Sequence, residues 1–440
     1  MYRAARRIVE KLRIRHHEAF FAGGWVRDFL LRRRAKDIDI ATSALPAQVM
    51  ELFPRSTAAG ASFGVVIVRI YGRAFEVATF RSEGPYLDGR HPSSVSFTGP
   101  KQDALRRDFT INGLFYDPIA DRVIDYVGGR ADLQKHIVRT IGNPEARFSE
   151  DRLRMLRAVR FVCVLDFSIA AETQNAIREL AAGILQVSAE RIREELLKIL
   201  AAPRRARGLD LMQETGLLAH ILPEVEAMRG IPQPADYHPE GDVYLHTRAA
   251  LDLLKNPSPE LALATLLHDV GKPPTLALAD RIRFDGHVEK GALMAAEICK
   301  RLHMSNDGTE QIVDLVRNHL RFIDAPDMRK STLRRFLGKK NFPDHLELHR
   351  VDCLSSHRNL DNYWYCRREW EQLQKEPPPM PRLISGHDLA NLGFEPGPIF
   401  REILRAVEDC QLEGTIRTRE EALDFVLRNF GRGIKAGEGG

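Results

Sequence analysis

Two stretches decide the fold of this chain: FAGGWVRD at residues 21–28 and KDIDIA at residues 36–41. In the first, two glycines end an apolar run and open a basic helix. In the second, Asp37 and Asp39 alternate with isoleucines, and residues i and i+2 of a strand point to the same face. Two neighbouring carboxylates repel unless a cation neutralises them, and a hard divalent ion, most simply Mg²⁺, fits. Glycines and a helix N-terminus favour phosphate. The two stretches predict a metal-dependent phosphoryl or nucleotidyl transfer site.

Length and composition set the class of protein. At 440 residues, 44% hydrophobic and 28% charged, the chain is an ordinary globular protein with more than one domain. The net charge of +5 permits nucleic-acid binding. Basic residues cluster at 32–34, 204–207 and 329–340. Each cluster alone is typical of a solvated helix face, but beside a nucleotidyl-transfer site we expect contacts to RNA phosphates.

Cysteine spacing and the absence of long apolar runs bear on the compartment. None of the five cysteines forms a Cys-x-x-Cys pair, so neither a disulfide framework nor a zinc finger is indicated. Residues 1–15 are basic and contain no apolar signal core. No segment approaches the length of a membrane span. We expect a cytoplasmic protein with reduced thiols and no membrane association.

The hydrophobic pattern changes from strands and helices to helices alone. We expect strands at 18–22 and 37–41, a helix at 25–33, and hairpins at 63–80 and 115–126. From about residue 148 apolar residues recur at helical spacing. The predicted fold class is α+β, with a small mixed-sheet head followed by an all-α neck, a helical body and a helical tail. These parts are expected at residues 1–142, 143–228, 229–357 and 358–440, respectively.

The pattern Gly-Gly-x-Val-Arg-Asp with Asp-x-Asp resembles the nucleotidyltransferase superfamily that includes DNA polymerase beta. The likeness is greatest to its class II tRNA nucleotidyltransferases (CCA-adding enzymes) and bacterial poly(A) polymerases. Further segments resemble motifs of that family in the same order. They correspond to its flexible loop, its sugar-recognition motif, the junction of head and neck, the nucleotide-templating motif and the final neck motif: residues 81–92, 106–112, 125–129, 150–154 and 190–195.

This resemblance implies attack by an RNA 3′-hydroxyl on the α-phosphate of a nucleoside triphosphate. Asp37 and Asp39 would hold Mg²⁺ ions that activate the hydroxyl and stabilise pyrophosphate. Glu76 would be a third catalytic carboxylate, although a glutamate on such a strand is as often simply exposed. Asp108 would accept a hydrogen bond from a ribose hydroxyl. The nucleotide-binding residues implied are Gly23, Gly24, Arg27, Arg107, Asp108, Asn112, Asp151, Arg154, Arg157 and Arg160.

Asp151 and Arg154 have two interpretations. They lie three apart on a predicted helix and so share a face. A helix of this sequence would also allow an ordinary salt bridge from Glu150 to Arg154. With the upstream motifs, the pair predicts base selection instead. Cytosine and adenine each offer an amino donor beside a ring-nitrogen acceptor, which a carboxylate and a guanidinium complement. Uracil and guanine would fail both contacts.

The second half carries a series of histidines and aspartates that resembles the HD phosphohydrolase superfamily. The resemblance implies a divalent-metal site at His246, His268, Asp269 and Asp352 that activates water against a phosphoester, with Ni²⁺, Mn²⁺, Co²⁺ or Mg²⁺. His287 and His319 are available for a second ion or for substrate phosphate. The alternative is a helical domain that keeps histidines in its core or on its surface. The later pair His387-Asp388 is predicted to be structural.

The resemblances together imply addition of CCA to the 3′ end of tRNA from CTP and ATP, without a nucleic-acid template. Poly(A) polymerase and A-adding tRNA nucleotidyltransferase are the close alternatives, and the loop at residues 81–92 disfavours an enzyme that adds only C. A metal phosphohydrolase with an RNA-binding head is the alternative from a different class. The oligomeric state stays open.

Overall fold

The computed structural model describes residues 1–35, 37–58, 64–84, 94–234, 241–278, 281–376 and 381–431. Lys36, Phe63, most of the loop at 81–92, and parts of the segments around 237 and 378 lie outside them. The described chain divides into two compact units. The first unit takes its residues from 1–230, 255–263 and 296–309, and the second from 231–254, 264–295 and 310–440. The finer division at residues 142, 228 and 357 stays a prediction.

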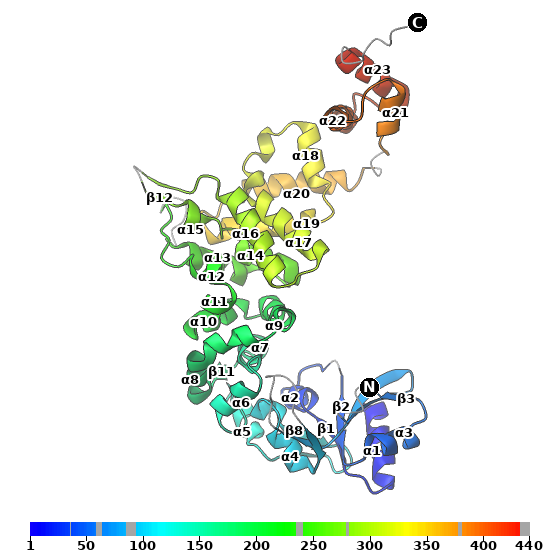
Figure 1. Ribbon diagram of the computed structural model, residues 1–440, viewed down its shortest axis with the longest axis vertical. Helices are drawn as coiled ribbons and strands as arrows, with labels where there is room; N and C mark the ends of the chain where they lie inside the picture. Colours follow the sequence, from blue (N-terminus) through cyan, green and yellow to red (C-terminus); the bar gives the residue numbers. More distant parts are fainter. Residues whose placement is uncertain are drawn as a thin grey trace. The chain divides into compact units, whose positions relative to one another are not determined.

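A seven-stranded mixed sheet forms the head of the first unit (Figure 1). Its order is β3-β4-β5-β2-β1-β8-β9, with β2 parallel to β5 and the other neighbours antiparallel. The strands are β1 (Ala19–Ala22), β2 (Asp39–Thr42), β3 (Ser56–Ala58), β4 (Val65–Ile70), β5 (Arg73–Thr79), β8 (Leu114–Asp117) and β9 (Arg122–Asp125). The predicted mixed-sheet head is confirmed.

Strand β1 is buried on both faces because its two phenylalanines alternate. Phe20 packs against Phe80 and Phe115. Phe21 points to the other face and meets the rings of Tyr2 and Trp25. Tyr2 belongs to α1 (Tyr2–Ile14) and Trp25 to α2 (Gly24–Leu30), so helices cover that face of the sheet. The apolar run that precedes the glycines is therefore a central strand.

Both predicted hairpins are present in the described residues, as β4–β5 and β8–β9. The predicted strand at 37–41 starts later, because regular pairing begins at Asp39, opposite Ala22. Asp37 precedes the strand and is exposed. The helix α3 (Pro46–Leu52) begins at a proline, which the first turn of a helix tolerates. A short hairpin of β6 (Arg81–Glu83) and β7 (Val95–Phe97) flanks the loop, and α4 (Pro100–Leu105), η2 (Thr110–Asn112) and α5 (Gly129–Gln134) complete the head.

The neck is helical, with one departure from the prediction. Asp151 and Arg154 do not share a helix, because α6 (Pro144–Glu150) ends before Asp151, which is extended. The carboxylate of Asp151 accepts the amide N–H of Leu153 at 3.0 Å and so turns the chain into α7 (Arg154–Leu165). The neck continues through α8 (Ala171–Leu180), η3 (Ala181–Gln186), α9 (Ala189–Ala201), α10 (Arg205–Glu214), α11 (Leu217–Ile221) and α12 (Pro223–Glu226), with a two-stranded sheet of β10 (Ile137–Val138) and β11 (Ser168–Ile169).

The second half is built from helices, as predicted, with a short hairpin of β12 (Ala277–Leu278) and β13 (Ile282–Arg283) that the sequence analysis missed. Its helices are α13 (Val243–Leu253), α14 (Pro259–Leu267), α15 (Lys272–Thr275), α16 (His287–Arg301), α17 (Asn306–Asn318), η4 (His319–Phe322), η5 (Ala325–Asp327), α18 (Lys330–Leu337), α19 (Phe342–Ser355), α20 (Asp361–Leu373), α21 (Gly386–Asn391), α22 (Pro398–Glu413) and α23 (Arg419–Phe430).

Three features of the described chain bear on earlier predictions. All five cysteines are free. None of the described helices is both long enough and apolar enough to cross a bilayer. Asp388 caps α21 by accepting hydrogen bonds from the amide and hydroxyl of Ser385, and it pairs with Arg419 at 2.6 Å, as a structural residue would.

Candidate functional site

A pocket of about 610 Å³ in the first unit gathers the predicted nucleotide residues. Its wall comes from the turn between β1 and α2, from β2 and β5, from the segment around η2, and from α7 and α9. All the residues predicted for the nucleotide and its metal line this pocket, except Asp37. Residues 150 positions apart in the sequence thus meet around one cavity, as a binding site requires.

Gly23 is required by the geometry of the turn. Its φ is +66°, and a Cβ there would lie 3.0 Å from Nη1 of Arg107. Gly24 follows as the first residue of α2. A side chain at position 23 would be strained and would press on a pocket arginine, so the backbone stays open toward the cavity.

Asp39 and Glu76 place carboxylates at the pocket from the neighbouring strands β2 and β5. Desolvation in the pocket, together with the charges of Asp37 and Glu76, raises the pKa of Asp39 to about 6. Three oxygen-donor side chains are therefore close enough to repel one another. This donor set fits a hard divalent cation, which would remove the repulsion.

Arginines dominate the rest of the pocket wall. Eight arginines and four carboxylates line it: Arg27, Arg81, Arg106, Arg107, Arg154, Arg157, Arg160 and Arg191 against Asp39, Glu76, Asp108 and Asp151. An excess of four positive charges suits a polyphosphate. Arg81, Arg106 and Arg191 were not predicted as binding residues, although each stands in a segment that resembles a family motif.

Asp108 joins the head to the neck. Its Oδ1 accepts the Phe109 amide at 2.8 Å and Nδ2 of Asn112 at 3.2 Å, while its Oδ2 accepts Nε and Nη2 of Arg157 at 2.9 and 2.5 Å. Burial alone would raise the pKa of this carboxyl, but these donors outweigh it and lower the pKa to about 2. Four donors fill the lone pairs of a carboxylate. A contact to ribose would require Arg157 to release one of them.

Asp151 and Arg154 are each held by a partner. Oδ2 of Asp151 accepts Nη2 of Arg191 at 2.8 Å. Nη1 of Arg154 lies 2.5 Å from Oε2 of Glu150, which is the salt bridge of the alternative interpretation. The salt bridge does not remove Arg154 from the cavity, because both side chains of the proposed base-selecting pair line the pocket.

Phe161 is a pocket residue that the sequence analysis missed. The guanidinium groups of Arg160, Arg27 and Arg157 lie 4.5, 5.3 and 5.7 Å from its ring centre. The ring also contacts Phe109 edge to face. An aromatic face attracts cations, so Phe161 supports three like charges at one wall of the pocket.

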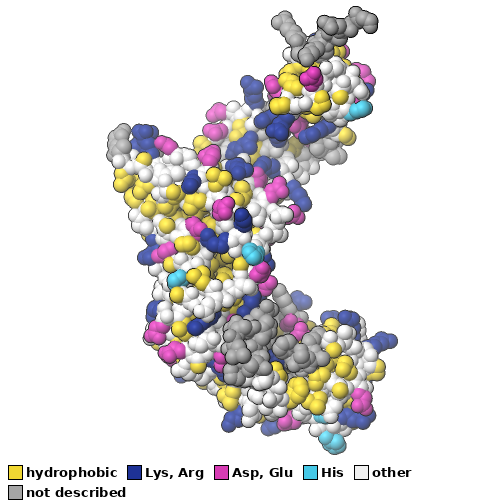
Figure 2. All heavy atoms as spheres, in the orientation of Figure 1, with side chains coloured by type: hydrophobic (Ala, Val, Ile, Leu, Met, Phe, Trp, Pro, Cys, Tyr) yellow, Lys and Arg dark blue, Asp and Glu magenta, His cyan; other side chains and the backbone are white. Residues whose placement is uncertain are grey.

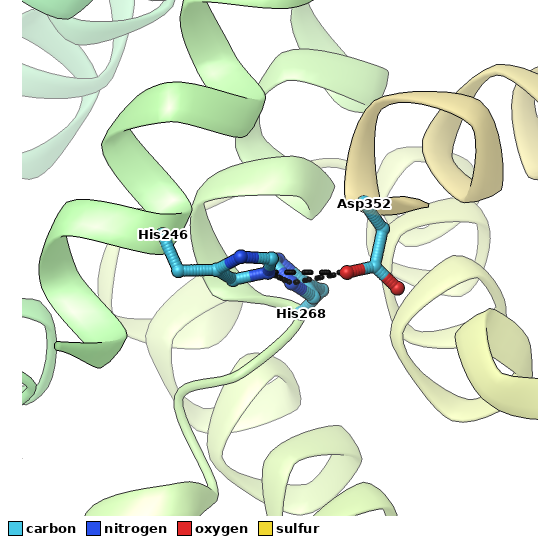
Figure 3. A group of neighbouring side chains, drawn as sticks. All are labelled: His246, His268 and Asp352. Carbon is cyan, nitrogen blue, oxygen red and sulfur yellow. Dashed lines mark hydrogen bonds and ion pairs between the residues drawn. The ribbon is translucent and has the colours of Figure 1, made fainter. Parts of the chain in front are cut away.

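The second unit brings the predicted histidines and aspartates together in two groups. The first contains His246 of α13, His268 and Asp352 of α19 (Figure 3). Nε2 of His246 lies 3.2 Å from Nε2 of His268 and 3.1 Å from Oδ1 of Asp352. The second group contains Asp269, His287 and His319. In this group, Nε2 of His287 lies 3.9 Å and Nε2 of His319 lies 3.8 Å from Oδ1 of Asp269.

Hydrogen bonding sets the tautomer of three of these histidines. Nδ1 of His268, His287 and His319 lies 2.7, 2.8 and 2.7 Å from the carbonyl oxygens of Thr265, Phe284 and Val316. A carbonyl only accepts, so each Nδ1 carries the proton and each Nε2 presents a lone pair to its group. Burial also lowers the pKa of His319 to about 4, which keeps the ring neutral.

These distances fit divalent ions. Two ligand atoms that each lie about 2.1 Å from one ion are at most about 4.2 Å apart. Nε2 of His287 and Nε2 of His319 are buried and make no hydrogen bond within the described chain. Asp269 is kept ionised: burial opposes its charge, but Lys272, at 2.7 Å, and the histidines hold its pKa well below the ordinary value. Neutral imidazoles and ionised carboxylates are the forms that bind metal.

Comparisons with known proteins agree with this architecture. Family profiles match the poly A polymerase head domain at residues 19–139, the probable RNA and SrmB-binding site of polymerase A at 166–229, and the HD domain at 236–353. The CCA-adding enzyme of Geobacillus stearothermophilus is 45% identical over 215 residues, which are 49% of this chain and 53% of that one. The chain thus matches about half the length of that relative in this alignment.

Other relatives match over nearly their whole length. The CCA-adding enzyme of Lactobacillus johnsonii is 30% identical over 437 residues, 98% of each chain. The crystal structure of the Bacillus stearothermophilus CCA-adding enzyme in complex with CTP superposes with a TM-score of 0.65 at 28% identity, again over 98% of both chains. A structure of a CCA-adding enzyme with ATP shares the fold, with a TM-score of 0.64 at 20% identity. On this whole-length similarity, the chain belongs to the family of CCA-adding enzymes.

Proposed function

We propose that this protein adds C, C and A to the 3′ end of tRNA, from CTP and ATP, without a nucleic-acid template and with release of pyrophosphate. The observation that carries the proposal is the pocket of the first unit. It combines an acidic corner at Asp39 and Glu76 with a wall of eight arginines and the pair Asp151 and Arg154. The cytoplasm is the proposed place of action.

The residues divide the work by charge. Asp37, Asp39 and Glu76 would hold divalent ions, which supply charge stabilisation for the attacking hydroxyl and the leaving pyrophosphate. Arg27 and Arg107, which line the pocket with Gly23 and Gly24, would bind the triphosphate. Asp151 would accept the exocyclic amino group of cytosine or adenine, and Arg154 would donate to the ring nitrogen beside it. Asp108 and Asn112 would select ribose once Arg157 releases Asp108 to bind the nucleotide.

The test offers the purified protein tRNA that lacks CCA, with each nucleotide alone and in pairs. We expect two C residues from CTP alone and a terminal A only when ATP is also present. Long tails from ATP alone would identify a poly(A) polymerase. Addition of A to tRNA ending in CC, without C addition, would identify an A-adding enzyme. Asp39→Asn should abolish addition, with Glu51→Gln, an exposed residue of the same unit, as the matched control.

A second activity is favoured by the two histidine–aspartate groups. We propose that the second unit binds two divalent ions, among Ni²⁺, Mn²⁺, Co²⁺ and Mg²⁺, and hydrolyses phosphoesters. The lone pairs of His268, His287 and His319 and the ionised Asp269 support this proposal. Bound ions would supply Lewis acidity to the phosphoryl group.

His268→Ala should lower metal content and hydrolysis while nucleotide addition continues. The matched control is His387→Ala, which removes the exposed histidine of the other His-Asp pair. Thermal melting must accompany the assay because His268 is fully buried. Wild-type protein that is folded, binds no metal and hydrolyses nothing would refute this activity. If Asp39→Asn loses nucleotide addition but keeps hydrolysis, the two sites act separately. If the wild-type protein hydrolyses phosphoesters but adds no nucleotides, a phosphohydrolase with an RNA-binding head would be favoured.

A further inference from the structure

We infer that the metal-binding pocket of the second unit takes esters of a single phosphate with a flat aromatic group, and that Phe284 is the wall against which this group lies. The inference rests on the phosphohydrolase activity proposed above and specifies its substrate class. It also assigns a binding role to the β12–β13 hairpin, which the sequence analysis did not anticipate.

The pocket beside the two metal-ligand groups is large for a phosphate alone. Its volume is about 410 Å³, within the range of about 300–1,000 Å³ that is typical of sites for small organic ligands. Its lining includes proposed ligand residues, among them Asp269 and Asp352. It also includes hydrocarbon from Pro234, Ile282, Phe284, Leu320 and Ile323. A phosphate bound at the ligand residues would therefore have apolar side chains in the same pocket for its organic group.

The charge of this pocket differs from that of the nucleotide pocket. Apart from histidines, its basic lining residues are Lys272 and Arg283, in contrast to the eight arginines of the first unit. Lys272 already binds Oδ2 of Asp269 at 2.7 Å and Oε1 of Gln233 at 2.6 Å. Two divalent ions would balance the charge of one phosphate. A triphosphate or an RNA backbone carries more negative charge, and few further cationic side chains line the pocket to bind it. The charge favours a substrate with one phosphate.

Phe284 is held in a defined position relative to His287, one of the proposed ligands. Its carbonyl oxygen accepts Nδ1–H of the ligand His287 at 2.8 Å, so the residue that orients the ligand also supplies the aromatic face. Nζ of Lys272 lies 5.4 Å from the ring centre. Aromatic faces take flat rings in offset or edge-to-face contact. The ring is thus placed to bind the organic part of an ester whose phosphate lies at the metal groups.

The rim of the pocket is also apolar. Ile323, a lining residue, is 59% exposed, and Leu278, the strand partner of the lining residue Ile282 in the β12–β13 hairpin, is 69% exposed. In Figure 2, hydrophobic side chains (yellow) gather over the part of the second unit where Figure 1 places β12 and α15. Exposed apolar surface of this kind marks a place where an apolar group binds.

The reaction itself is a simple hydrolysis. The bond between phosphorus and the ester oxygen breaks, and a bond forms between phosphorus and the oxygen of water. One proton of the water ends on the released alcohol, and the other passes to phosphate or solvent. No oxidant, reductant or further substrate is needed.

The test compares two single-phosphate esters whose leaving groups are both alcohols, so that intrinsic reactivity differs little: benzyl phosphate and ethyl phosphate, with Mn²⁺. A second measurement does not depend on turnover: calorimetry gives the affinities of benzylphosphonate and ethylphosphonate for the Mn²⁺-loaded full chain. We expect the benzyl compounds to be favoured by about tenfold in both kcat/KM and affinity. Phe284→Ala should bring both ratios close to one with two ions still bound.

Two further variants keep the experiment decisive if Phe284→Ala loses metal or does not fold. Ile323→Ser alters the exposed rim and should also lower the ratios. Leu293→Ala, at an exposed leucine of α16 outside the pocket lining, should leave them unchanged. Equal affinities for the two phosphonates would overturn the inference while hydrolysis of both esters left the proposed activity intact. Selective phosphonate binding without hydrolysis of any ester would refute the activity and support the binding preference.

Discussion

The ion pair between Asp108 and Arg157 allows a quantitative prediction about stability. It connects the head to α7, and together with the hydrogen bonds from Asn112 and the Phe109 amide it lowers the pKa of Asp108 from 3.8 to about 2 against the effect of burial. At about 1.4 kcal/mol per pKa unit, this difference corresponds to about 2 kcal/mol. The Asp108 side chain is only 11% exposed, so solvent screens little of this contribution. We expect Asp108→Asn to lower the free energy of unfolding of the first unit by about 2 kcal/mol at pH 7.

The pH dependence has a definite sign. The folded protein binds this proton more weakly than the unfolded chain, whose pKa is the ordinary 3.8. The stabilisation is therefore complete well above pH 4 and is lost as the pH falls towards 2. The difference between wild type and Asp108→Asn should shrink over the same interval.

Urea denaturation followed by tryptophan fluorescence can measure this difference. Trp25 lies in the first unit, and replacing Trp364 and Trp370 of the second unit with phenylalanine leaves Trp25 as the reporter. The matched control is Asp166→Asn, because Asp166 pairs with Arg204 at 2.7 Å but both side chains are more than half exposed. An exposed pair contributes at most about 1 kcal/mol. An effect of Asp108→Asn no larger than that of the control, or one that stays constant from pH 7 to pH 3, would refute the reasoning.

Three other predictions concern the nucleotide pocket. Asp39→Asn should raise the melting temperature at pH 7 while abolishing nucleotide addition. Because the pKa of Asp39 is raised, its charged form destabilises the folded protein as the pH rises through 4 to 6. Thermal melting and tRNA extension together check this, and a lowered melting temperature would contradict it. Arg154→Ala should change the ratios in which the four nucleotides are incorporated, and an equal loss for all four would instead support a structural salt bridge to Glu150. Phe161→Leu should raise KM for CTP several-fold with little change in kcat, since it removes the ring that supports three arginines; an unchanged KM would show that these arginines hold their positions without it.

Several parts of the fold and the sites follow from local sequence patterns. The hairpins β4–β5 and β8–β9 were predictable because alternating side chains and a short polar turn specify them locally. The glycine turn before α2 was predictable because position 23 has a positive φ that glycine adopts readily. The histidines and aspartates proposed as metal ligands of the second unit were predictable as residue types, since histidine and aspartate in that order are typical of one class of site.

Other parts depend on contacts that neighbours in the sequence cannot reveal. The helix expected through Asp151 and Arg154 is broken, because the Asp151 carboxylate binds the Leu153 amide in preference to continuing the helix. Asp151 meets Arg191 only because α9 packs on α7. Tertiary packing also brings the three arginines around Phe161 together and forms the apolar pocket beside Phe284.

The sequence by itself thus determined which chemical groups this protein has and the local turns that present them. The tertiary structure decided which groups meet, at what distance and in which ionisation state. The physical reason is that a turn or a strand depends on adjacent residues, whereas other properties depend on partners brought close by packing. The low pKa of Asp108 and the free Nε2 lone pairs of His268 and His319 are two examples.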